Sequence, residues 1–143
     1  SAWLPLKNKG ALRGLNVWLY HKDEWAKAHP IFAGLPTGML DYTYYREIIP
    51  DRAWSGLDTP AEAVCGANDA SFDYSSGLMV SVHRLGAGCF VLNTLRLREH
   101  LGHHPAADRL VWNVVHFLAT GRDQPLADLA PDFEGQMRAC GLF

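Results

Sequence analysis

Two runs of β-forming residues, joined by a short connection, constrain the fold more than any other feature of the chain. The runs cover residues 78–84 and 89–95, and the connecting segment 85–88 reads Leu-Gly-Ala-Gly. A glycine-containing connection of this length is typical of a β-hairpin. The second run is almost continuously apolar, as expected of a strand covered on both faces. The sequence therefore predicts an antiparallel hairpin over residues 78–95.

One long helix is predicted over residues 105–120. Pro105 suits the first helical position, Asp108 places negative charge in the first turn, and Gly121 ends the helix. Apolar residues recur at three- and four-residue spacing, which predicts a stripe that faces the core. That stripe consists of Leu110, Val114, Phe117 and Leu118. We expect the helix to pack on the hairpin, with these residues in the core: Val91, Leu92, Val111, Val114 and Phe117.

The first 36 residues are predicted to form a polar lead-in, a strand, a short helix and a loop. Residues 1–13 read as the lead-in, and residues 14–20 are β-rich and mostly apolar, as in a strand. Residues 21–28 are polar and predict two helical turns with Asp23 as the N-cap. Two prolines within residues 29–36 exclude a continuous helix there, so this segment is predicted to be a shaped loop.

The middle of the chain is predicted to contain short strands separated by turns. Residues 39–49 are aromatic and β-branched enough for one strand, or for two with a kink. Residues 51–60 carry turn chemistry around Trp54, and residues 61–66 predict a short strand that ends in a polar loop over residues 67–76. The tail, residues 122–143, lacks periodicity and is expected to wrap over the surface.

Composition excludes several classes of protein. The chain has 143 residues, which predicts a single domain over 1–143. Hydrophobic residues make up 48% and the net charge is −2, so neither a disordered chain nor a nucleic-acid partner is expected. No apolar run approaches the length of about 20 residues needed to cross a bilayer, so no membrane partner is expected. Three cysteines without CxxC spacing (Cys65, Cys89 and Cys140) predict neither a disulfide framework nor a zinc site.

Four segments together resemble a known bacterial domain family. They are HKDEWAKAHPIFAGLP, MLDYTYYREIIPD, GLMVSVHRLGAGCFVLNTLRLREHLG and PAADRLVWNVVHFLA, and the resemblance covers residues 15–120. The family is the C-terminal domain attached to some family 2 glycoside hydrolases, which are β-galactosidase-like enzymes. That domain is related to class I glutamine amidotransferases and to trehalose-utilisation (ThuA-like) proteins. The resemblance implies an accessory domain at the C-terminal portion of a longer protein, in many members without chemistry of its own.

The same resemblance implies an α/β fold with a flavodoxin-like, amidotransferase-like layered sheet. Such a sheet is partly parallel, and here it would also contain the antiparallel hairpin and the helix 105–120. This chain departs from the family because it lacks the βα units that usually carry the first parallel strands. The resemblance therefore implies a sheet that is incomplete at its N-terminus, or one completed by another segment of the parent.

No catalytic constellation stands out in the sequence. An amidotransferase needs a cysteine nucleophile on a tight strand-to-helix turn with a histidine nearby, and Cys65 lacks both the turn and a His-x-Glu partner. Cys65 and Cys89 are expected to be small buried hydrophobes. Glycoside hydrolysis needs two paired carboxylates, and nothing pairs the available ones. Those are Glu24, Asp41, Glu47 and Glu99, of which Glu24 and Glu99 are expected at the solvated surface.

No metal or cofactor is predicted. His100, His103 and His104 cluster beside Glu99, but they lie in a glycine-containing segment without helical ligand spacing. We expect them to form a solvated loop before the helix. His116 falls beside the apolar stripe and is expected to be structural.

Binding is the remaining function, because open α/β sheets place ligands beyond the carboxyl ends of their strands. Donor groups and a flat aromatic ring at those ends suit the hydroxyls and the C–H face of a sugar. The candidate ligand-binding residues are His21, Trp25, Asp41, Tyr42, Asn93, Arg96, Arg98 and Glu99. The alternative is that the arginines form ion pairs with Glu47, Glu99 or Asp108, and that the tyrosines pack under a loop.

Arg96 and Arg98 share one face if the strand continues beyond Leu95. Adjacent guanidiniums repel each other unless a carboxylate or a ligand lies between them. We therefore expect at least one of them to be salt-bridged within the domain, with Glu47 or Glu99 as its partner. Leu95 and Leu97 are expected to anchor the segment in the core.

Three functions remain open at this stage. The first is a non-catalytic accessory domain of a carbohydrate-active enzyme, which contributes an interface or a sugar-binding surface to the catalytic domains of a glycoside hydrolase. The second is a small stand-alone sugar-processing enzyme. The third is a structural domain for oligomerisation, which would expose an apolar patch. The cysteine usage leaves both a cytoplasmic and a periplasmic location open.

Overall fold

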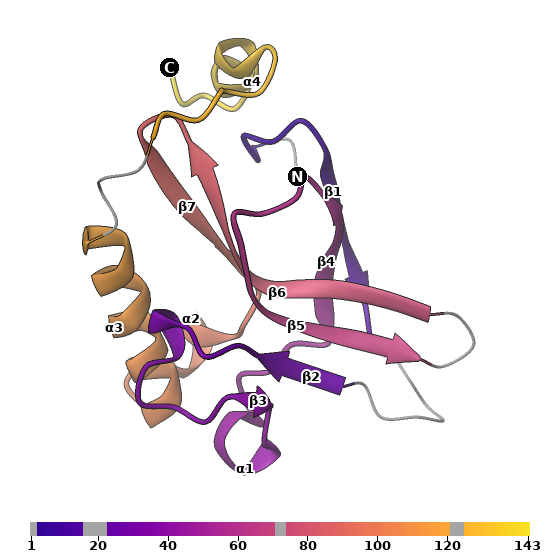
Figure 1. Cartoon of the computed structure of the whole chain (residues 1–143), viewed down its shortest axis with the longest axis vertical. Coiled ribbons are helices and arrows are strands. Elements are labelled where there is room, and N and C mark those ends of the chain that lie inside the picture. Colours follow the sequence, from indigo (N-terminus) through magenta and orange to yellow (C-terminus); the bar gives the residue numbers. More distant parts are fainter. Residues whose placement is uncertain (1–2, 16–22, 71–73, 121–124) are drawn as a thin grey trace.

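A twisted antiparallel sheet forms the centre of the computed structural model, which describes residues 3–15, 23–70, 74–120 and 125–143 (Figure 1). Its strands are β1 (Lys9–Gly14), β2 (Asp23–Ala26), β3 (Gly38–Met39), β4 (Arg52–Leu57), β5 (Glu62–Ala70), β6 (Tyr74–Leu85) and β7 (Gly88–Asn93). The strand order is β1-β4-β6-β5-β2-β3, with β7 also paired to β6. Every pairing that the structure describes is antiparallel. The partly parallel sheet expected from the resemblance is therefore wrong for these strands.

The sheet forks along one edge of β6. One edge of this long strand pairs with β5 from Tyr74 to Val82. On the other edge Leu78 pairs with Trp54 of β4, whereas the pairs from Val80↔Asn93 to Leu85↔Gly88 join β6 to β7. Because β4 and β7 use the same edge, they diverge at Met79, whose carbonyl accepts a hydrogen bond from the Thr94 N–H at 2.8 Å. A pocket opens at this fork.

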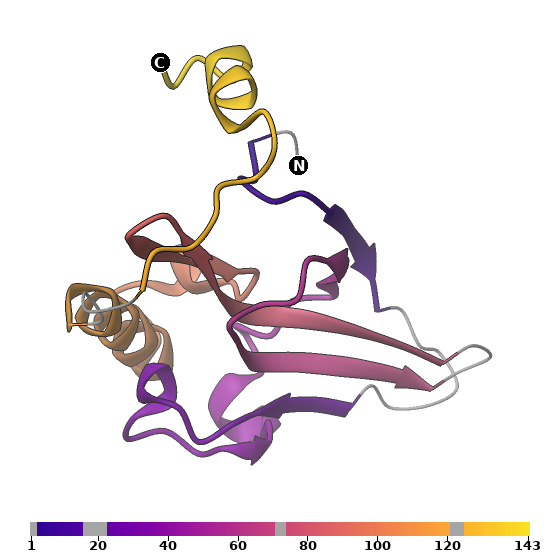
Figure 2. The same ribbon diagram turned by 45° about the horizontal axis from the view of Figure 1, so that its top comes forward.

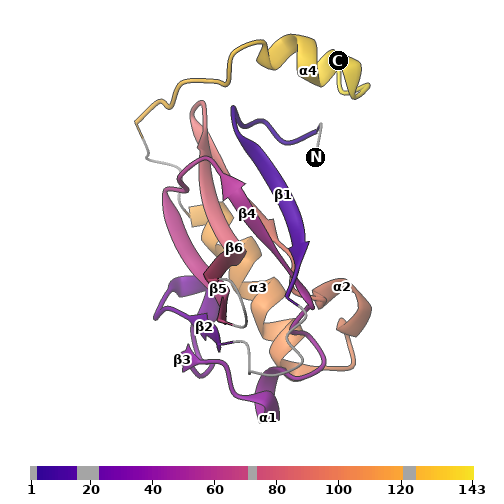
Figure 3. The same ribbon diagram turned by 90° about the vertical axis from the view of Figure 1, so that its right-hand side faces the viewer.

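One face of the sheet is covered by α3 (Pro105–Thr120), which lies behind the strands in Figure 3. The remaining helices are short: η1 (Pro30–Phe32), α1 (Tyr42–Tyr45), α2 (Leu97–His100) and α4 (Phe133–Ala139). The side chain of Asn113 fixes α3 to η1 by donating to the carbonyls of Ile31 and Ala33, both at 3.0 Å. No helix in the described part of the chain is long and apolar enough to cross a membrane.

The predicted hairpin and the predicted helix are confirmed, the helix with the same bounds. Of the predicted core residues, Leu92 is buried. The others are half-buried and pack against the core: Val91, Val111, Val114 and Phe117. The predicted stripe is displaced toward the start of α3, since Ala106, Ala107 and Leu110 are its buried apolar residues and Leu118 is 36% exposed. The predicted cover of β7 on both faces is wrong, because most of its residues are only half-buried or exposed.

The N-terminal predictions are corrected in two places. β1 occupies the predicted polar lead-in, where its pairing with β4 stabilises residues that are individually polar or small. β2 replaces the helical turns predicted with Asp23 as N-cap. Glu24 and Ala26 are buried, while Asp23 is exposed and Trp25 half-buried, so the burial alternates as in a strand. Residues 16–20 of the strand predicted over 14–20 lie outside the described residues, and Gly14 ends β1. Residues 29–36 contain only the single turn η1, as predicted, with His29 as its N-cap.

The middle of the chain needs similar corrections. The strand predicted over 39–49 is instead the short β3 followed by α1, whose N-cap is Asp41. The turns predicted over 51–60 are largely β4, which is stabilised by β1 and β6 on either side. The short strand predicted over 61–66 is confirmed as part of β5, which continues into the predicted loop 67–76. The tail, predicted without elements, contains α4.

A second group of buried apolar residues lies outside the main core cluster. It comprises Leu4, Leu6, Leu92 and Met137. The segments that carry them are tied together by polar contacts: Lys9 Nζ donates to Gln136 Oε1 at 2.6 Å, and the Ala127 N–H donates to the Gly86 carbonyl at 2.9 Å. Figure 2 shows the N-terminal segment and α4 on the same side of the molecule.

Candidate binding face

A row of directly paired apolar residues crosses the sheet on the face away from the main core. The residues of this aromatic row, from β3 to β1, are Met39, Trp25, Gly66, Leu78, Trp54 and Leu12. Paired residues of an antiparallel sheet point to the same face, and their sequence neighbours point to the other. Those neighbours include Ala26, Ala53 and Met79, which belong to the main core cluster. The aromatic row therefore lines the open face.

Gly66 gives Trp25 its place in the row. A Cβ atom at position 66 would lie 2.7 Å from the Trp25 ring, so the indole lies directly over the glycine backbone. The ammonium of Lys27 is 5.9 Å from the centre of the same ring. Trp54 lies three strands away from Trp25 in the sheet order. At the usual strand spacing this separation is about 14 Å.

Two hollows on the open face adjoin at Trp54. The first, which we call the sheet hollow, has a volume of about 280 Å³, and its lining includes Asn68, Ser76 and Asp58 beside Trp25 and Leu78. The second, the fork pocket, has a volume of about 500 Å³ and opens where β4 and β7 diverge. Its lining comprises Trp3, Leu12, Pro50, Asp51, Arg52, Trp54, Leu92, Asn93, Thr94 and Arg96. Trp54 therefore belongs to the aromatic row and also lines both hollows.

Backbone hydrogen bonds fix the polar side of the fork pocket. The Asn93 side chain binds the backbone of Leu95 through both amide atoms, at 3.1 and 3.2 Å, so it holds the turn after β7. The Arg96 N–H donates to the Ile48 carbonyl at 2.9 Å. The side chains of Arg52 and Arg96 are exposed, and neither forms an ion pair within the part of the chain that the structure describes.

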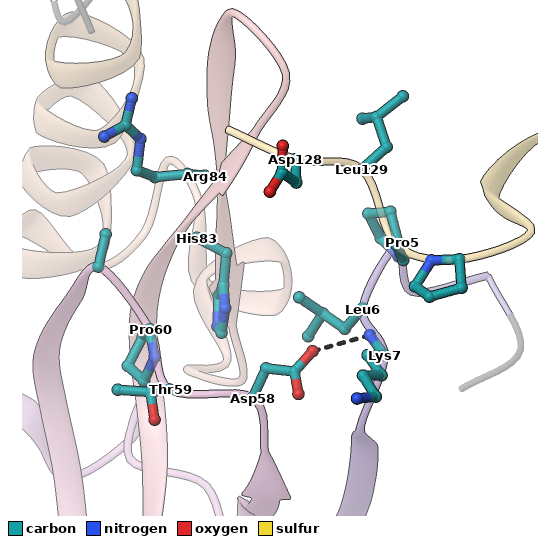
Figure 4. A pocket seen from close by; sticks show the side chains of 13 residues that line it. Pro5, Leu6, Lys7, Asp58, Thr59, Pro60, His83, Arg84, Asp128 and Leu129 are labelled. Carbon is teal, nitrogen blue, oxygen red and sulfur yellow. Dashed lines mark hydrogen bonds between the residues drawn. The ribbon is translucent and has the colours of Figure 1, made fainter. Parts of the chain in front are cut away.

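A third hollow of about 410 Å³ adjoins the sheet hollow, since Asp58 and Pro60 line both. The Asp58 carboxylate accepts hydrogen bonds from the Lys7 N–H at 2.7 Å and from the backbone and side chain of Asn8. Figure 4 shows His83 on the inner wall above Asp58, with Asp128 on the opposite side and the Arg84 guanidinium pointing away.

His83 is a buried residue in the wall of the third hollow, and its surroundings favour the neutral imidazole. Its side chain stacks on Phe90 with ring centres 5.1 Å apart, and its Nε2 lies 3.0 Å from Ser81 Oγ. Burial lowers the pKa of His83, and the nearby Asp58 carboxylate opposes this effect only in part. The imidazole therefore serves as a neutral hydrogen-bonding group near pH 7.

The structure brings three of the predicted ligand-binding residues to the open face. Trp25 lines the sheet hollow, and Asn93 and Arg96 line the fork pocket. Arg98 and Glu99 lie on α2, exposed and outside both hollows. His21 falls outside the described residues.

The predicted cluster on α1 has local roles that keep it apart from these hollows. Asp41 accepts a hydrogen bond from the Thr43 N–H at 2.6 Å, which caps α1 and lowers the pKa of the carboxyl group. Tyr42 is exposed, and its hydroxyl donates to Glu24 Oε1 at 3.3 Å. Tyr45 is buried, and burial raises its pKa to about 12.

The predicted salt bridge of Arg96 or Arg98 is wrong for the described residues. Glu47, the expected partner, lies 3.7 Å from His100 Nδ1 instead. The strand ends at Asn93 and α2 follows, so the two arginines do not alternate along an extended strand. The predicted anchoring by Leu95 and Leu97 is confirmed, because both are buried in the main core cluster.

Sequence reasoning missed Trp54, Leu78, Arg52 and Trp3 as residues of the binding face. Trp54 was assigned to a turn because glycine and proline surround it. The alternation of buried Ala53 with half-buried Trp54 is the strand signal that identifies it. The pairing of Trp54 with Leu78 depends on strand register, which has no local sequence signal here.

The groups considered for catalysis have structural or solvated environments. Cys65 is fully buried, and desolvation raises the pKa of its thiol to about 12, so the thiolate needed by an amidotransferase is disfavoured. Cys89 is half-buried rather than buried. Glu24 was expected at the surface but is buried beneath Tyr42, whereas Glu99 is exposed as expected.

The predicted histidine loop is confirmed for His103 and His104, which lie between α2 and α3, and is wrong for His100; the predicted structural role of His116 is also corrected. His100 belongs to α2 and is half-buried beside His104, their ring centres 6.2 Å apart. His116 is exposed on α3. Within the described ranges, no three metal-binding side chains of the histidine, cysteine or acidic type gather into a site.

The structure is a mixed α/β domain with an antiparallel sheet and an aromatic row on its open face. No protein-family model, no curated protein and no solved structure matches the chain.

Proposed function

We propose that this chain is a non-catalytic carbohydrate-binding domain, accessory to a glycoside hydrolase of the β-galactosidase-like kind. The observation that carries the proposal is the aromatic row, in which Trp25 and Trp54 lie on one open sheet face. A sugar ring has apolar C–H faces and hydroxyl groups at its edges. An indole supplies a flat apolar surface with one polar handle, and it therefore suits the faces of the ring.

The polar residues beside the row suit the edges of the sugar. Asn68 and Ser76 line the sheet hollow between the two tryptophans, where an amide and a hydroxyl group can both donate and accept. The separation of about 14 Å between the tryptophans favours an oligosaccharide over a single sugar. Because the row is held by paired strands, little conformational entropy is lost on binding.

The parent enzyme belongs to the same proposal and rests on the resemblance of residues 15–120 to accessory domains of family 2 glycoside hydrolases. The catalytic domains of that enzyme are the proposed partner. The flavodoxin-like relationship is also a proposal: it requires parallel strands beyond the antiparallel ones described, supplied by another segment of the parent.

The outer side of α3 favours a second candidate function, an interface with those catalytic domains or with another copy of the chain. Trp112 is 65% exposed there, and Val115 and Leu118 are exposed near it at helical spacing. Exposed apolar patches of this kind are typical of interaction surfaces. Light scattering coupled to gel filtration distinguishes self-association, which Trp112→Ala should weaken if this side of α3 joins two copies.

Calorimetric titration with neutral galacto-oligosaccharides of increasing length tests the main proposal. We expect binding to the wild-type chain and a loss of at least about tenfold in affinity for Trp25→Ala and for Trp54→Ala, since stacking residues dominate such sites. Trp112→Ala is the matched control, because it removes a more exposed indole from the opposite side of the domain. No binding to any saccharide, or an equal loss in Trp112→Ala, would contradict the proposal.

A further inference from the structure

The fork pocket combines aromatic walls with an excess of positive charge. Trp3 and Trp54 line it together with Arg52, Arg96 and Asp51. The charged side chains of this lining, two arginines and one carboxylate, leave one net positive charge, whereas the charged side chain among the described residues that line the sheet hollow is the Asp58 carboxylate. A ligand that fills both regions therefore meets a carboxylate in the sheet hollow and an excess of positive charge in the fork pocket.

The two arginines reach the pocket from the two sides of the fork. Arg52 begins β4 and pairs with Gly14, and Arg96 follows β7 with its N–H bound to the Ile48 carbonyl. Their backbones are therefore fixed by different parts of the fold. Both guanidiniums are exposed and without an ion pair among the described residues. Two such groups at one pocket repel each other, and an anion between them removes this repulsion.

We infer that the fork pocket binds the anionic group of an acidic saccharide, one whose ring carries a carboxylate or a sulfate. The inference rests on the proposed function and deepens it by naming the ligand class. A guanidinium group can bind two oxygens of a carboxylate or sulfate at once. In this proposal the indoles of Trp3 and Trp54 contact the body of the sugar ring. Thr94 Oγ1 adds a hydroxyl at the base of the fork.

The test compares oligosaccharides of equal length that differ in charge. Calorimetric titration uses neutral galacto-oligosaccharide, oligogalacturonate and a sulfated galacto-oligosaccharide, each at low and at high salt. We expect the wild-type chain to bind at least one of the acidic ligands about tenfold more tightly than the neutral one, with the difference reduced by salt. The acidic ligand that shows the preference identifies the anionic group.

Matched variants separate a site from general charge. Arg52→Gln and Arg96→Gln should each remove most of the preference, so that the affinity for the acidic ligand falls toward that for the neutral one. Arg98→Gln is the control, since Arg98 is exposed on α2 outside the pocket. Equal affinity for neutral and acidic ligands, or an equal loss in Arg98→Gln, overturns this inference alone. If no saccharide binds, the proposed function fails as well.

Discussion

Several buried polar side chains each have a hydrogen-bond partner, as the cost of burying such groups requires. Glu24 accepts from the Tyr42 hydroxyl, Asn113 donates to two carbonyls of the η1 segment, and Ser81 pairs with His83. The sequence analysis did not predict that any of these polar residues is buried. Partners such as Asn113 and Ile31 are 82 residues apart, so the fold is what creates the hydrogen bond.

His83 should make stability depend on pH. Its pKa is lowered in the folded protein from an ordinary value of 6.5, so the unfolded chain takes up the proton first as the pH falls. The stabilisation by the neutral form is therefore complete above pH 6.5 and is lost as the pH falls through the folded-state pKa. The measurement is urea unfolding at a series of pH values between roughly 7.5 and 4.5. We expect the free energy of unfolding to fall less steeply with falling pH in His83→Gln than in the wild-type chain.

His116→Gln is the control for that measurement, because His116 is exposed on α3. Its unfolding free energy should follow the wild-type pH dependence. A His83→Gln variant with the full wild-type slope would show that the acid sensitivity arises elsewhere.

At the scale of elements, the close approach of β5 to β2 and β6 at Gly66 fixes the position of Trp25 in the aromatic row. A Cβ atom on residue 66 would lie 2.5 Å from the Gly77 carbonyl oxygen and 2.7 Å from the Trp25 ring. Gly66→Ala must therefore displace the indole or the strand, and overpacking of this kind costs about 1–3 kcal/mol. We expect lower stability in chemical denaturation together with weaker saccharide binding.

Gly88→Ala in β7 is a matched control, since the nearest atom to its added Cβ is the Leu85 carbonyl oxygen at 3.9 Å. This variant should retain both stability and binding. If Gly66→Ala behaves like Gly88→Ala, then the indole of Trp25 is not fixed by the glycine, and the argument for a preorganised row fails.

The elements that sequence analysis identified correctly are those with local signals. The hairpin of β6 and β7 has turn residues between β-rich runs, and α3 has periodicity over sixteen residues. Pairing with distant strands stabilises β1, β2 and β4. Their own residues predicted a polar lead-in, helical turns and turns, respectively, because local sequence does not encode that pairing. The site follows the same division: Trp25, Asn93 and Arg96 could be identified from donor and aromatic chemistry near strand ends. Trp54 could not, because its place beside Leu78 depends on register.

At the scale of the whole molecule, the domain has two buried apolar groups of unequal size. The main cluster joins the sheet to α3 and η1. The smaller group consists of the buried apolar residues outside that cluster, which lie on the N-terminal segment, β7 and α4: Leu4, Leu6, Leu92 and Met137. A small cluster closed by a few hydrogen bonds opens at a lower free energy than a large one. The N-terminal segment also carries Trp3 to the fork pocket, so its opening removes one wall of the proposed site.

Hydrogen exchange should therefore resolve two steps of opening. We expect the backbone amides of residues 3–8 and 125–143 to exchange faster than those of β5, β6 and α3. Leu4→Ala removes a fully buried side chain and should accelerate exchange in the first two segments, whereas Leu110→Ala, in the main cluster, should accelerate it throughout. A ligand that binds only the closed form protects it by mass action, so an acidic saccharide should slow exchange in residues 3–8 of the wild-type chain. Uniform acceleration in Leu4→Ala would show instead that both clusters unfold as one cooperative unit.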